Sequence, residues 1–301
     1  MHKFLLLSSF LILTACIDPT KIFNDEQKGE GIFSDDYEVY EMPRELKEIS
    51  GFTFITDSIV AAIEDEHGLI YYYDLNKNKT INTFRFAGDG DYEDILRVKK
   101  DLFVLESKGD IYQVANFKSK PMVTKFKTPL KSKNDIEGLA YDEDSNSILM
   151  SVKEKNLEKD DDEAKQKNIY AFSLNTKKFN TIPAYKIKFE TIEKHFEGDK
   201  LTEISKRFLR AVGNENQNEI IKPTALAFKP STQDLYVLSS INNIIVVMSK
   251  ADTIKQIIPF HGKAFSQPEG MAFNSKGELF ISNEGHKHPA NIIKIKKLDA
   301  K

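Results

Sequence analysis

The chain contains no tryptophan, only one cysteine and no marked excess of charge of either sign. The single cysteine, Cys16, cannot form a disulfide within the chain, so the fold must be held by its apolar core. The net charge of −3 lacks the basic excess that is typical of nucleic-acid-binding domains, and we expect no nucleic-acid partner. Nucleophile elbows, phosphate loops and zinc spacings are also absent, so no motif indicates nucleophilic catalysis.

The one long apolar run lies at the start, over residues 4–13, after the polar pair His2 and Lys3. It is shorter than the roughly 20 residues that a permanent membrane helix needs. A basic start, a short apolar core and small residues at its end are typical of an export signal. The residues Leu-Thr-Ala-Cys at 13–16 resemble the bacterial lipobox, which implies cleavage before Cys16 and attachment of acyl chains, palmitate among them, to that residue.

This interpretation divides the chain into a signal peptide (1–15), a polar, flexible tether (16–36) and one folded domain (37–301). Two or more acyl chains suffice for stable anchoring, so the membrane is the first expected partner. The residue after the cysteine is Ile17 rather than Asp, and by resemblance to the enterobacterial sorting rule the outer membrane is favoured over the inner one. The alternative is an ordinary signal peptide with an incidental cysteine.

Five segments of the domain repeat one layout, in which three or four strand-like runs follow one another. The first runs are residues 50–54, 93–96, 137–141, 224–228 and 269–273. The spacing from Gly51 to Asp94 is 43 residues, from Asp94 to Gly138 it is 44, and from Ala225 to Gly270 it is 45. A period of about 40 to 45 residues with four strands per unit is typical of β-propeller blades. The sequence therefore predicts an all-β propeller.

One interval is twice as long as the others, because 87 residues separate Gly138 from Ala225. It holds a charged stretch at 155–167 and a segment at 190–213 whose apolar residues have helical spacing. Insertions in the third blade explain this length, which gives five blades with a partly helical insert around 190–213. Six blades, with a degenerate one hidden in the interval, is the alternative.

The fifth copy lacks a fourth strand, whereas residues 37–42 alternate apolar and acidic side chains and belong to no other copy. An unpaired sheet edge is a liability that propellers commonly remove by closing the ring. We therefore predict that residues 37–42 form the outer strand of the last blade.

Several of these strands resemble the SdiA-regulated family. The first-strand motifs are Glu-Gly-Leu-Ala-Tyr-Asp at 137–142 and Gln-Pro-Glu-Gly-Met-Ala-Phe at 267–273, and second strands such as Ile-Glu-Asp-Glu-His-Gly at 63–68 also match. The resemblance covers residues 37–297 and implies a propeller, without a settled activity. The chain departs from the family pattern at Thr224 and Ala225 in blade four and at Asp94 in blade two.

Acidic residues recur at equivalent places of the repeats. Glu93, Glu137 and Glu269 begin first strands, which line the channel of a propeller. Further polar residues end the second strands: Asp65, Glu66, Glu106, Glu154, Asn283 and Glu284. Clustered carboxylates repel one another unless protonated or bridged by a cation, and ligand sets made only of oxygen favour Ca²⁺ or Mg²⁺. We therefore consider a Ca²⁺ site at the channel mouth formed by these nine residues, against the alternative that the acids cap strands or face water.

Two functions follow from this prediction. One is a binding or scaffold propeller of the cell envelope, which presents its channel face and its insert to a protein partner or a small ligand. The other is a metal-dependent hydrolase similar to the lactonase and phytase propellers. The absence of an acid in blade four, where Thr224 stands, argues against the second. A sensor of an envelope polymer is a third alternative without a feature of its own.

Overall fold

A computed structural model describes residues 37–157, 165–195, 221–241, 243–260 and 265–296. All of these belong to the compact unit that spans Gly31–Lys301. Cys16, the signal peptide, the tether and residues 196–213 of the expected insert lie outside the described residues. Among the described residues, no helix is both long and apolar enough to cross a bilayer.

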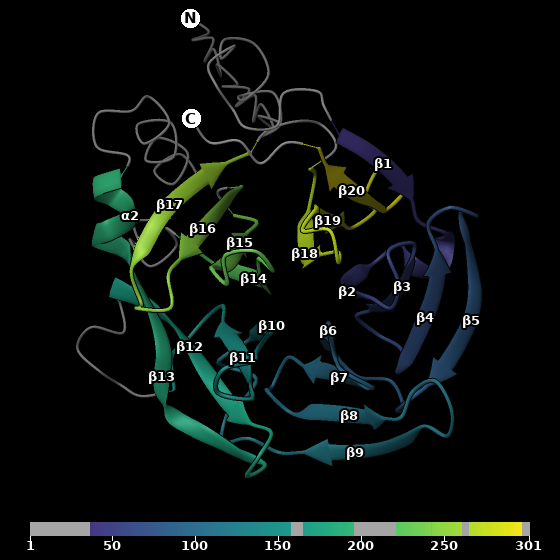
Figure 1. The fold of residues 1–301 in the computed structure, drawn as a ribbon, viewed down its shortest axis with the longest axis horizontal. Helices are drawn as coiled ribbons and strands as arrows, with labels where there is room; N and C mark the ends of the chain where they lie inside the picture. Colours follow the sequence, from purple (N-terminus) through teal and green to yellow (C-terminus); the bar gives the residue numbers. More distant parts are fainter. Residues whose placement is uncertain (1–36, 158–164, 196–220, 242, 261–264, 297–301) are drawn as a thin grey trace, which may run out of the picture. The chain divides into compact units, whose positions relative to one another are not determined.

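Twenty strands of the described residues form five separate four-stranded antiparallel sheets, which Figure 1 shows arranged in a ring around a common centre. Blade one runs outward from the channel in sequence order: β2 (Ile49–Phe54), β3 (Ile59–Glu64), β4 (Leu69–Asp74) and β5 (Lys79–Arg85). The first three strands are almost wholly buried, whereas every residue of β5 is exposed or half-buried. This pattern follows from the layout, because inner strands are covered on both faces and the outer strand meets solvent.

Blades two, three and four repeat this order. Their strands are β6 (Tyr92–Val98), β7 (Asp101–Glu106), β8 (Ile111–Ala115) and β9 (Met122–Phe126); β10 (Ile136–Asp142), β11 (Ser147–Val152), β12 (Gln166–Ser173) and β13 (Lys178–Lys188); β14 (Pro223–Phe228), β15 (Leu235–Ser239), β16 (Ile244–Met248) and β17 (Ile254–Pro259). The prediction of five blades is confirmed, because the long interval contributes the extended strand β13 and the short helix α2 (Phe189–His195) to the described chain.

Blade five is completed by the start of the domain. It contains β18 (Pro268–Phe273), β19 (Leu279–Asn283) and β20 (Asn291–Ile295), and its outer strand is β1 (Tyr37–Glu41). Strands β1 and β20 are antiparallel, with Tyr37 opposite Ile295 and Glu41 opposite Asn291. The predicted closure is therefore confirmed. The short 3-10 helix η1 (Arg44–Leu46) leads from β1 into blade one.

The core is divided among the interfaces between neighbouring blades. Five clusters of buried apolar side chains occur, and each joins two adjacent sheets. Phe189 and Ile192 of α2 belong to the cluster between blades three and four, which explains why this helix lies against the outer strands there. Burial of this area is the main stabilising contribution, since no disulfide is available.

Candidate functional site

A bulge interrupts the first strand of every blade at the same place. In blade one, Ile49 pairs with Glu64 and Gly51 with Ile63, so Ser50 between them has no partner across the pair. A β-bulge leaves its extra residue unpaired and redirects the side chain. The residues at the bulge in the five blades are Ser50, Glu93, Glu137, Thr224 and Glu269. All five line one cavity at the channel.

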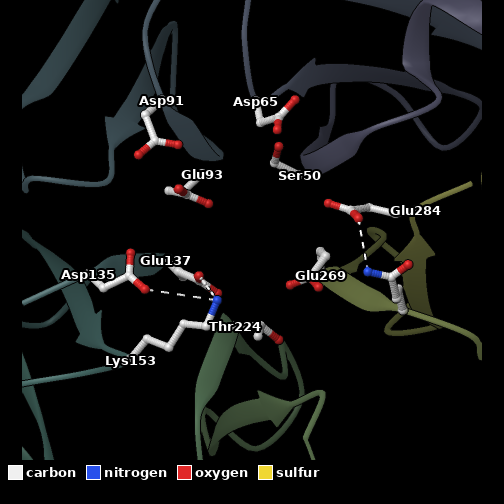
Figure 2. A pocket seen from close by; sticks show the side chains of 11 residues that line it. Ser50, Asp65, Asp91, Glu93, Asp135, Glu137, Lys153, Thr224, Glu269 and Glu284 are labelled. Atoms are coloured by element: carbon white, nitrogen blue, oxygen red, sulfur yellow. Dashed lines mark hydrogen bonds and ion pairs between the residues drawn. The ribbon is translucent and has the colours of Figure 1, made fainter. Parts of the chain in front are cut away.

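Two further positions of the repeat complete this cavity, which has a volume of about 310 Å³. The position two residues before the bulge contributes Asp91, Asp135 and Gln267, and the position just after the second strand contributes Asp65, Lys153 and Glu284. Every lining residue thus comes from one of three repeated positions. Figure 2 shows these side chains converging on a common space from all five blades.

The charge around the cavity is uneven. Seven lining residues carry a carboxyl group: Asp65, Asp91, Glu93, Asp135, Glu137, Glu269 and Glu284. Blade four contributes none of them, and its bulge residue, Thr224, donates its hydroxyl hydrogen to the Pro268 carbonyl at 3.3 Å. Lys153 is the only basic residue of the described lining. Carboxyl groups therefore reach the cavity from four of the five blades, and blade four presents only a neutral residue there.

The tightest group of acids lies between blades two and three. One carboxylate oxygen each of Glu93, Asp135 and Glu137 lies within 4.8 Å of the others. The Lys153 ammonium donates a hydrogen bond to Glu137, and its nitrogen lies 4.0 Å from an Asp135 oxygen. These three carboxylates are near enough to one another to share a single cation.

Burial raises the pKa of several acids in the cavity. For Glu93, burial and then the neighbouring Glu137 raise the pKa to about 10. Burial raises the pKa of Glu137 to about 8, although Lys153 opposes the shift, and burial with Glu284 raises that of Glu269 to about 7. The pKa of Asp65 reaches about 6, chiefly through burial. Seven carboxyl groups surround one ammonium group, and burial disfavours their charged forms, so the cavity favours protons or additional cations.

Comparison with known proteins agrees with this architecture. A family model described as SdiA-regulated matches residues 32–288. The chain belongs to the SdiA-regulated family. No curated protein matches it.

Solved structures similar to this SdiA-regulated chain are distant from it in sequence. A glutaminyl cyclase from Myxococcus xanthus superposes with a TM-score of 0.53 at 9% identity, covering 85% of this chain and 93% of the other. A luciferin-regenerating enzyme reaches a TM-score of 0.48 at 11% identity, over 88% and 97% of the two chains. A streptogramin B lyase reaches 0.46 at 12% identity, over 85% and 96%. At such identities the likeness concerns the fold alone.

The structure of this SdiA-regulated propeller brings five of the predicted ligands together. Glu93, Glu137, Glu269, Asp65 and Glu284 line the cavity.

The other four predicted ligands do not line it. Glu66 is exposed. Glu106 forms ion pairs with Lys108 and with Lys125, the latter at 2.8 Å. Glu154 pairs with Lys222 at 2.7 Å. Asn283 is fully buried and donates a hydrogen bond to Asn291 at 2.9 Å.

The position of each residue at the end of its second strand explains why some predicted ligands line the cavity and others do not. Glu64, Glu106 and Asn283 are equivalent, because each is the last residue of its strand and pairs with the residue just before the bulge. The next residue along the chain is the one that reaches the cavity in blades one, three and five, as Asp65 and Lys153 do. Successive residues of a strand point in opposite directions, so a shift of one position removes a side chain from the channel.

Sequence reasoning missed Asp91, Asp135 and Lys153 as members of the site. Asp91 and Asp135 precede their strands, where acids are common in turns. Their equal distance from Glu93 and Glu137, two positions in both repeats, is the pattern that could have identified them.

Proposed function

We propose that this chain is a cell-envelope binding protein whose channel cavity takes a cation, with Ca²⁺ as the ion that suits its donors. The observation that carries the proposal is the approach of Glu93, Asp135 and Glu137 to within 4.8 Å. Ca²⁺ takes six to eight oxygen ligands in flexible geometry, and these carboxylates with water would supply them. Pockets for organic ligands are mostly apolar, whereas this cavity is lined by carboxylates, which favours an ion over an apolar molecule.

Calorimetric titration of the purified full chain with CaCl2 and MgCl2 tests the proposal. We expect one Ca²⁺ per chain, and weakening by about tenfold or more in Glu93→Gln and Glu137→Gln, because each change removes one charged oxygen ligand. Glu106→Gln is the matched control, since that carboxylate is bound by Lys125 outside the cavity. Absence of heat with the unmodified protein would reject the cation site.

The envelope location is a separate part of the proposal and rests on the lipobox-like residues 13–16. We propose that Cys16 carries acyl chains that hold the propeller at the outer membrane. Mass spectrometry of the mature N-terminal peptide should find an acylated cysteine, and Cys16→Ser should move the protein from the membrane fraction to the soluble fraction. An unmodified Cys16 in the membrane fraction would contradict this part alone.

Hydrolysis is the second candidate, and the position of Glu269 favours it. Burial and Glu284 raise the pKa of Glu269 to about 7, which is the range in which a carboxyl group serves as a general acid or base. A bound cation would polarise the bond to be broken in such a site. A screen of lactones and phosphate esters with added Ca²⁺ tests this role. Turnover that falls by about a hundredfold in Glu269→Gln would support it, and no turnover would leave binding alone.

A further inference from the structure

One of the three repeated positions carries opposite charges in different blades. The residue after the second strand is Asp65 in blade one and Glu284 in blade five, but it is Lys153 in blade three. Because the backbone repeats, Lys153 projects into the same cavity as those two acids (Figure 2). A cationic side chain is thus positioned where the neighbouring repeats supply carboxylates.

The ammonium of Lys153 lies against two of the three grouped carboxylates. It donates a hydrogen bond to Glu137 and lies 4.0 Å from Asp135. Glu93, the third member, has no ion pair with a basic group among the described residues, and Glu137 is the first neighbour that raises its pKa. A cation that contacts all three carboxylates would therefore lie close to the ammonium that Glu137 and Asp135 already hold.

We infer that Lys153 is an intramolecular cation that competes for the site, so that a bound ion must displace its ammonium from Glu137 and Asp135. This inference rests on the proposed cation-binding function and names the residue that sets its affinity and selectivity. A monovalent ion brings no more charge than the tethered ammonium, whereas a divalent ion brings twice as much. Lys153 therefore selects for divalent cations.

The surroundings allow the ammonium to move. The Lys153 side chain is 27% exposed, and lysine has a long flexible stem. Its charge also acts on Glu269 and Glu284, where it opposes the rise in pKa caused mainly by burial. A displaced ammonium would thus remain within the influence of two further carboxylates instead of being left unpaired in a buried place.

The experiment is a calorimetric titration of four full-length proteins with CaCl2: the unmodified chain, Lys153→Met, Lys153→Arg and Lys125→Met. We expect Lys153→Met to bind Ca²⁺ at least about tenfold more tightly, because it removes the competing charge and retains the length of the stem. Lys153→Arg keeps that charge and should bind like the unmodified chain. Lys125→Met removes an ammonium that is also held by carboxylates, Glu106 and Asp110, but outside the cavity, and should change nothing.

Selectivity gives a second measurement. Replacing choline chloride by NaCl at equal ionic strength should weaken Ca²⁺ binding to Lys153→Met several-fold more than binding to the unmodified chain, because sodium can then enter the site. Equal Ca²⁺ affinities for the unmodified chain and Lys153→Met would overturn the inference while leaving the proposed function intact. No binding by either protein would reject the proposed function itself. Binding by Lys153→Met alone would support the competition by Lys153 but would reject the proposed function, because the unmodified chain would then bind no cation.

Folding of the variant is followed by thermal unfolding with and without Ca²⁺. If Lys153→Met does not fold in either condition, Lys153→Gln carries the same test, because its amide can still donate a hydrogen bond to Glu137. The same tightening is expected, and an affinity equal to that of the unmodified chain would again overturn the inference.

Discussion

Blades three and four have the same strand order and different chemistry at the channel. Both have four strands in sequential order and a bulge at the start of the first strand. At the three channel positions blade three carries Asp135, Glu137 and Lys153. Blade four carries Lys222, Thr224 and Ser240 instead.

The residues that hold the ring together are therefore different from the residues that line the channel. Strand pairing and the apolar clusters between blades do not depend on the channel positions, so a blade can lose every acid there and keep its place. The bulge fixes where a side chain points, and the residue type alone decides its charge.

The largest effect is expected from deleting residues 37–41, which breaks the frame common to all blades. Strand β20 would keep β19 but lose its outer partner, and the Tyr73 hydroxyl would lose the Glu41 carbonyl that it meets at 3.1 Å. We expect the melting temperature of the whole domain to fall by about 10 °C or more, measured by circular dichroism. Val39→Thr, an exposed change within the same strand, should shift the free energy of unfolding by about 0.5 kcal/mol at most. Equal melting of the deleted and full chains would contradict this account of closure.

A smaller loss is expected from Asp94→Ala, which removes a link between blades two and three. The buried Asp94 carboxylate accepts hydrogen bonds from its neighbour Ile95 and, across the interface, from the Leu139 N–H, both at 2.7 Å. Leaving both N–H groups unsatisfied should lower the free energy of unfolding by about 2–4 kcal/mol in a urea titration. Asp94→Asn keeps one acceptor, so its free energy of unfolding should lie between those of the unmodified chain and Asp94→Ala. Blade three has Gly138 at the position equivalent to Asp94, so the interface between blades three and four lacks this link.

A moderate gain is expected from Glu93→Gln at alkaline pH. The folded pKa of Glu93, about 10, lies above its ordinary value of 4.5, so the stability associated with the protonated group is complete below pH 4.5 and is lost as the pH rises towards 10. At pH 8, between the two pKa values, the glutamine variant should therefore be more stable by at least about 1 kcal/mol, and the difference should vanish near pH 4.5. Thr224→Val changes the equivalent position of blade four and should show no such pH dependence. A stability difference between Glu93→Gln and the unmodified chain that does not vary with pH would contradict the raised pKa of Glu93.

The smallest effect is expected from Lys222→Met at the boundary of the two blades. Lys222 pairs with Glu154 at 2.7 Å, but the Glu154 side chain is 45% exposed. Surface ion pairs contribute at most about 1 kcal/mol, so the variant should melt within a few degrees of the unmodified chain. A larger loss, measured in the same buffer, would show that this ion pair stabilises the interface between blades three and four more than a surface ion pair does.

The sequence predicted the frame more completely than the site. The period of the first strands and the alternation over residues 37–42 identified five blades and the closing strand, because both depend on patterns that span many residues. The bulge adds one residue to each first strand, and at the ends of the second strands single positions decide which side chain faces the channel. Alternation therefore could not show that Lys153 rather than Glu154 faces the channel.

Closure by β1 also makes the fold a check on the completeness of the chain. The first described strand to be synthesised finds its partner only in β20, the last one. Until that strand has emerged, the ring stays open with unpaired edges, which are the surfaces that aggregate or are captured by quality control. A chain truncated before Ile295 thus cannot close the ring. This holds although blades one to four contain all of their strands.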